Sequence, residues 1–71
     1  MKIYVIQMFR NDGYGLRFDN FDYLVDTKVA VNCEEACGLA EFYAGPFKEI
    51  KNGIITFDSN TKKAVVTPFD I

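Results

Sequence analysis

The chain has 71 residues, of which 49% are apolar and 15% aromatic, and its formal net charge is -2. This length fits a single domain over residues 1–71, and the weak acidic balance argues against direct binding to nucleic acid or to an anionic membrane. The sequence contains no histidine, which removes the commonest proton-transfer group and metal ligand, so we expect no enzyme activity, no metal site and no cofactor.

Residues 2–10 have the alternation of a β-strand with apolar side chains on both faces. One face carries Ile3, Val5 and Phe9, and the other carries Tyr4, Ile6 and Met8. Because one helix can cover only one face, the second must be covered by a curled sheet, by loop aromatics or by another chain. We expect Tyr4, Ile6 and Met8 to face a homodimer mate or a protein partner, with burial by the chain's own loop as the alternative.

The next segment begins with the turn residues Asn11-Asp12-Gly13, which predict a hairpin and a short return strand through about Phe18. Residues 18–26 alternate aromatic residues with aspartates and predict an irregular loop with one helical turn. Residues 27–31 then predict a strand that leads into the helix.

Aromatic and acidic residues gather in this segment, and we expect them to form a partner-binding surface. Its members are Tyr14, Phe18, Asp19, Phe21, Asp22, Tyr23 and Asp26. Rigid rings among carboxylates suit a basic protein partner, including a complex that normally grips nucleic acid. The alternative is that the rings complete a thin core. The aspartates lack the spacing of a calcium loop, so we interpret them as a solvated acidic face.

Residues 32–45 carry a complete helix signal. Asn32 can cap the helix by accepting a hydrogen bond from the backbone N–H of Glu35, and Gly45 and Pro46 end it. Small residues dominate the buried stripe, with Leu39 and Tyr43 as its larger members. The stripe also holds Cys33 and Cys37, which we expect to be reduced and buried. Phe42 lies beyond the edge of this stripe and is either a margin of the core or a partner anchor.

After Pro46 the sequence predicts a three-stranded meander. Strands over residues 47–51 and 54–58 flank Asn52-Gly53, which is the strongest short hairpin signal. A third strand over residues 63–67 should end at Pro68, which lacks the backbone N–H that a central ladder needs. Alternation places Ile55 and Phe57 against Ala64 and Val66 on one face.

These elements predict an α+β fold, a twisted antiparallel sheet of four or five strands with the helix on one face. No segment has the length and apolarity of a signal peptide core or a membrane span, so we expect a cytoplasmic protein. In size and architecture the chain is similar to small phage-encoded proteins, some of which block host defence complexes such as CRISPR effectors. That likeness implies a non-enzymatic inhibitor that occupies a partner's surface. The alternative function is a small-ligand-binding or regulatory domain with a pocket between helix and sheet, near Tyr43 and Leu39.

Overall fold

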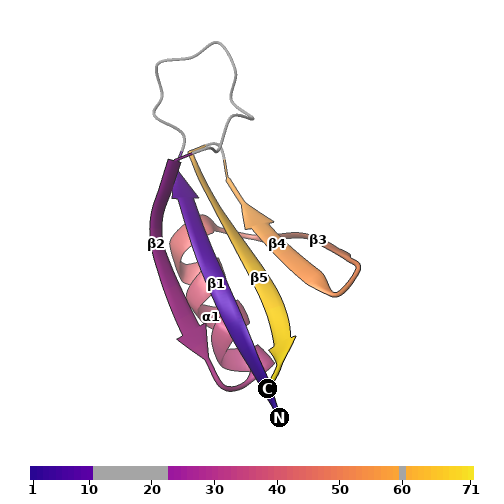
Figure 1. Cartoon of the computed structure of the whole chain (residues 1–71). Helices are drawn as coiled ribbons and strands as arrows, with labels where there is room; N and C mark the ends of the chain where they lie inside the picture. Colours follow the sequence, from indigo (N-terminus) through magenta and orange to yellow (C-terminus); the bar gives the residue numbers. More distant parts are fainter. Residues whose placement is uncertain (11–22, 60) are drawn as a thin grey trace.

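The computed structural model describes residues 1–10, 23–59 and 61–71. These residues form β1 (Lys2–Arg10), β2 (Tyr23–Ala30), α1 (Cys33–Ala44), β3 (Phe47–Lys51), β4 (Ile54–Asp58) and β5 (Lys62–Asp70). The strands make one antiparallel sheet in the order β2-β1-β5-β4-β3 (Figure 1). The predicted α+β fold with its C-terminal meander is confirmed.

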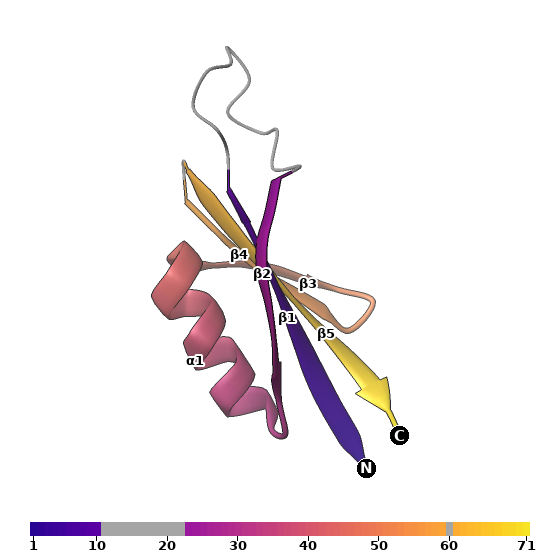
Figure 2. The same cartoon turned by 60° about the vertical axis from the view of Figure 1, so that its left-hand side comes forward.

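The helix and the sheet form two layers. Figure 2 views the sheet close to its edge and shows α1 along one side, while the β3–β4 hairpin turns toward the other side. The hairpin turns away from α1 because the sheet has the right-handed twist that is usual for antiparallel strands. The helix therefore covers the long strands, and the side chains of Phe47 and Ile50 in the hairpin stay 53% and 61% exposed. Among the described residues, no helix has the length and apolarity to cross a membrane.

The predicted start and end of the helix are confirmed, since α1 spans Cys33–Ala44 between Asn32 and Gly45. The Asn32 side chain accepts a hydrogen bond from the backbone N–H of Glu35 at 2.7 Å, which satisfies one of the unpaired donors of the first turn. At the other end, the Gly45 N–H donates to the carbonyl of Glu41 at 2.9 Å. Gly45 has φ 109° and ψ -154°, so its φ is positive as expected, but the residue is extended and does not adopt the left-handed helical geometry. The chain can thus leave α1 directly into β3.

The core lies between α1 and the central strands. Ala36, Ala40 and Ala44 of the helix are 0%, 0% and 2% exposed, and their small side chains allow the helix to approach the sheet closely. Ile6 and Val66, which are paired across β1 and β5, are the largest fully buried side chains beneath them. Burying a side chain of this size contributes about 1.5 to 3 kcal/mol, so these two positions dominate a core otherwise rich in alanine.

The two turn residues of the β3–β4 hairpin have the backbone angles that were predicted for them. Asn52 and Gly53 have φ values of 55° and 79°, as a two-residue hairpin turn requires. The predicted pairing across β4 and β5 is also confirmed, since Ile55 lies opposite Val66 and Phe57 opposite Ala64.

Both ends of two strands differ from the prediction. β2 spans Tyr23–Ala30 where 27–31 was predicted, and β5 spans Lys62–Asp70 where 63–67 was predicted. β2 begins at Tyr23, so residues 23–26 are strand and not loop, because β1 offers pairing partners as far as Arg10, opposite Tyr23. A register shift between Met8 and Phe9 absorbs one extra residue of β2. β5 also continues past Pro68 to Asp70. The ladder with β4 already ends at Val66, so Pro68 removes no donor from that side.

Candidate functional site

The predicted partner-binding set falls largely outside the described residues. The turn at 11–13, the return strand at 14–18 and the residues Tyr14, Phe18, Asp19, Phe21 and Asp22 all lie there. Tyr23 is the first residue of β2. The Asp26 carboxylate accepts a hydrogen bond from the Thr27 N–H at 2.8 Å and lies 3.8 Å from the Lys28 ammonium. Asp26 is therefore engaged within its own edge strand while half of its side chain stays exposed.

The prediction that Tyr4, Ile6 and Met8 of β1 face a partner is wrong, because these residues lie on the side of the sheet that α1 covers. Ile6 and Met8 are 0% and 5% exposed and belong to the core beneath α1, and Tyr4 packs against that core. They are buried because the alanine stripe of α1 leaves room for large side chains on the facing strands. The face of β1 that α1 does not cover is the one with Ile3, Val5, Gln7 and Phe9.

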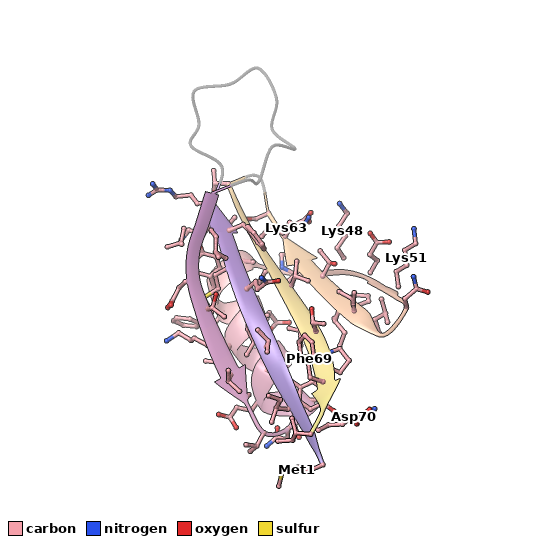
Figure 3. The ribbon with its side chains drawn as sticks, in the orientation of Figure 1. Met1, Lys48, Lys51, Lys63, Phe69 and Asp70 are labelled. Atoms are coloured by element: carbon pink, nitrogen blue, oxygen red, sulfur yellow. The ribbon has the colours of Figure 1, made fainter. Side chains whose placement is uncertain are left out.

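This uncovered surface continues across the neighbouring strands, and we call it the open face. Cross-strand pairing arranges it in four rows: Ile3 with Phe69; Val29, Val5 and Thr67; Thr27, Gln7, Val65 and Thr56; and Leu24, Phe9, Lys63 and Asp58. On β2, β1, β5 and β4 the first three rows carry no charged side chain, and the third row continues to Glu49 of β3, which lies opposite Thr56. Figure 3 looks onto this face and shows Phe69 in front of the sheet and Lys63 near its upper end. Among the described residues, the open face has no covering layer, and its first three rows on β2, β1 and β5 form a continuous surface of apolar and uncharged polar side chains. Its charges lie at Lys63 and Asp58 in the fourth row and at Glu49 on β3.

The outer surface of α1 has the opposite character. Phe42 is 93% exposed, so the interpretation of Phe42 as a margin of the core is wrong. At about 100 degrees per residue, Phe42 points almost directly away from the buried alanine stripe. Gly38 precedes it by one turn, and a Cβ placed on Gly38 would have no atom within 4 Å. The exposed side chains around them are Glu34, Glu35 and Glu41, and α1 contains no basic residue. We call this surface, Phe42 with Gly38 and the three glutamates, the acidic helix face.

The residues proposed for a ligand pocket are used in packing. Tyr43 donates its hydroxyl to the backbone carbonyl of Phe9 at 3.2 Å, and the Lys62 ammonium lies 5.1 Å from the centre of its ring. Leu39 is half-buried against the core. Tyr43 thus fastens the last turn of α1 to β1 and β5, a structural role that occupies its polar group.

The two cysteines are free thiols with their Sγ atoms 3.9 Å apart. Cys37 is half-buried, but Cys33 is exposed, so the expectation that both are buried is wrong for Cys33. Cys33 is the first residue of α1. Burial, the hydrogen bond with Cys33 and the neighbouring charges raise the pKa of the Cys37 thiol, which disfavours a reactive thiolate. No group of three or more potential metal-ligating Cys, Asp or Glu residues occurs within the described ranges.

No protein-family model, no curated protein and no solved structure matches this chain.

Proposed function

We propose that this chain is a non-enzymatic interaction protein that binds a basic surface of a protein partner through the acidic helix face and inhibits or modulates that partner by occupying it. The observation that carries this proposal is the 93% exposure of Phe42, on a helix whose two ends are fixed by capping hydrogen bonds. A phenylalanine left in water forgoes about 1.5 to 3 kcal/mol of burial energy that a partner's pocket can supply.

The geometry around Phe42 suits an anchor. Since Gly38 presents no side chain, partner atoms can pack against the ring and the bare backbone one turn before it. The side chain loses little freedom on binding because it has two rotatable bonds and a rigid helix behind it. Interface residues of this kind, central and aromatic, supply most of the binding energy in many complexes.

The charges around Phe42 define the chemistry of the partner. Glu34, Glu35 and Glu41 give the face three carboxylates, and no Lys or Arg of α1 offsets them. They complement lysines and arginines, which favours a fast, salt-sensitive association with a basic surface. Proteins that grip nucleic acid carry such surfaces. A complex of that kind, including a host defence complex attacked by a phage protein, is the target class that we propose.

The proposal is tested by capture and then by affinity. The tagged chain is incubated with lysate of the cells in which it is naturally expressed, beside the variants Phe42→Ala and Val31→Ala. Val31 is a matched control because it is also a large apolar side chain, 71% exposed, and lies outside the acidic helix face. We expect the wild type and Val31→Ala to capture the same protein, and Phe42→Ala to bind it at least about 30-fold more weakly, as the loss of a central anchor predicts.

The purified complex then provides the second measurement. Titration at increasing NaCl should weaken the wild-type affinity, and Glu41→Lys should weaken it further at low salt. Circular dichroism of each variant confirms that the fold is retained. A partner that binds wild type and Phe42→Ala equally, or whose affinity is unaffected by salt and by Glu41→Lys, would refute the proposal.

A further inference from the structure

The open face is a second surface, separate from the acidic helix face, and it lies on the other side of the sheet (Figure 2). Leu24, Val29 and Phe69 on it are 47%, 59% and 50% exposed, while Ile3, Val5, Phe9 and Val65 are half-buried. A contiguous apolar surface of this kind marks a place where another surface packs.

We propose that the open face binds a second copy of this chain, so that two sheets stack face to face in a symmetric dimer with both helices outside. The charged side chains of the open face are few and lie at its margins, which favours a second copy as the occupant. On β2, β1 and β5, the three rows from Ile3 to Gln7 contain only apolar, Thr and Gln side chains, so two copies can meet over these strands without opposing like charges. Glu49 of β3 lies beyond them, opposite Thr56. In the fourth row, Lys63 lies directly opposite Asp58 on the neighbouring strand, and this end of the face carries both signs.

Charge also excludes the acidic helix face as the dimer interface. Two such faces would oppose six carboxylates without a basic residue of α1 between them, whereas like charges across an interface are unfavourable. A basic partner, in turn, finds no carboxylate in the first three rows on β2, β1 and β5, because Glu49 lies outside these strands on β3. Charge therefore assigns the two surfaces to different occupants.

The area that two open faces can bury also suits a dimer. The strands β2, β1 and β5 are 8, 9 and 9 residues long, which gives a surface of about 30 Å by 14 Å, or about 400 Å² per partner before the relief of the side chains is counted. Such stacking buries roughly 1,000 Å² in total, at the low end for specific interfaces. We therefore expect a reversible dimer with a dissociation constant of about 10 to 100 μM. Stacked sheets at about 10 Å separation are a common architecture for faces of this composition.

Sedimentation of the full chain from about 1 to about 500 μM tests the proposal, since this range brackets the expected dissociation constant. The wild type should change from monomer to dimer. Val5→Lys, at the centre of the open face, should remain a monomer. The matched control Ile50→Lys should dimerise like the wild type, because Ile50 is 61% exposed and lies opposite Ile55 on the other side of the sheet. Val29→Lys repeats the test at a more exposed position, where the fold tolerates the charge more readily.

Other occupants give different results. A wild type that stays monomeric over the whole range overturns the proposal, whether the face is covered by another part of the chain or by a foreign partner. A dimer that persists in both Val5→Lys and Val29→Lys also overturns it. Pairing through the free edge of β2 would instead slow hydrogen exchange of the β2 amides on dimerisation, which face-to-face stacking does not predict. Phe42→Ala should dimerise normally, so failure of this proposal and failure of the partner-binding proposal are separate outcomes.

Discussion

Two adjacent valines in β5 lie on opposite faces of the sheet, so the unfolding free energy that each contributes shows which face is buried. Val66 is fully buried beneath α1, and Val65 is half-buried on the open face. Both lie in a central strand between β1 and β4, opposite Ile6 and Ile55 in one case and Gln7 and Thr56 in the other. Replacement of each by alanine is the same chemical change on opposite faces, so the loss of β-propensity largely cancels in the comparison.

The expected magnitudes follow from burial. Val66→Ala removes two buried carbons worth about 0.8 kcal/mol each and leaves a cavity that adds of order 1 kcal/mol, for a total of about 2.5 kcal/mol. Val65→Ala leaves no closed cavity and loses less than about 1 kcal/mol. The difference of about 1.5 to 2 kcal/mol is large against the total of about 4 to 10 kcal/mol expected for 71 residues.

Urea unfolding followed by far-ultraviolet circular dichroism measures both losses. The experiment is done at low micromolar concentration, where the proposed dimer is dissociated, and repeated at several hundred micromolar. At low concentration, Val65→Ala should unfold close to the wild type and Val66→Ala well before it. Equal losses for the two variants at low concentration would refute the assignment of the faces, because Val65 would then be as buried as Val66. A cost of Val65→Ala that appears only at high concentration would indicate the dimer.

Three further predictions concern α1. Asn32→Ala should lower the unfolding free energy by about 1 kcal/mol through loss of the cap, while Asn32→Asp should retain most of it, as thermal melts of the two variants will measure. Gly38→Ala should stabilise the chain by about 0.5 to 1 kcal/mol, because its Cβ meets no neighbour in mid-helix, whereas Gly45→Ala, at φ 109°, should destabilise it; the same sign for both would contradict this. The raised pKa of Cys37 means that the folded state holds the thiol proton more tightly than the unfolded state, so its contribution to stability is present at neutral pH and lost as pH rises through the folded-state pKa. Urea unfolding at a series of alkaline pH values should show a smaller decline for Cys37→Ala than for the wild type.

Local signals were sufficient for the helix and the meander. Asn32, Gly45 and the Asn52-Gly53 turn act through hydrogen bonds and backbone angles within a few residues, and each has the predicted effect. The ends of β2 and β5 could not be predicted in this way. They depend on the length of β1, which pairs with both strands, and this partnership between distant segments outweighs the local turn and proline signals.

The face of β1 was predicted on the wrong side, although the sequence contains a signal for it. Gln7 lies on the same face as Ile3, Val5 and Phe9, whereas the face with Tyr4, Ile6 and Met8 has no comparable polar member. A polar residue in the middle of one face favours that face for exposure. Similarly, the spacing of seven positions from Glu35 to Phe42 places both on one side of the helix, which points Phe42 outward.

The order of the strands has a consequence for synthesis on the ribosome. β1 is made first, but it takes a central place in the sheet and pairs on one side with β5, which is made last among the strands. Until β5 emerges, a nine-residue segment with apolar side chains on both faces lacks one of its two neighbours. Such long-range pairing slows folding and exposes nascent chains to aggregation. Truncation before Lys62 should therefore yield an insoluble product, even though the capped helix and the first hairpin of the meander would both be intact in sequence.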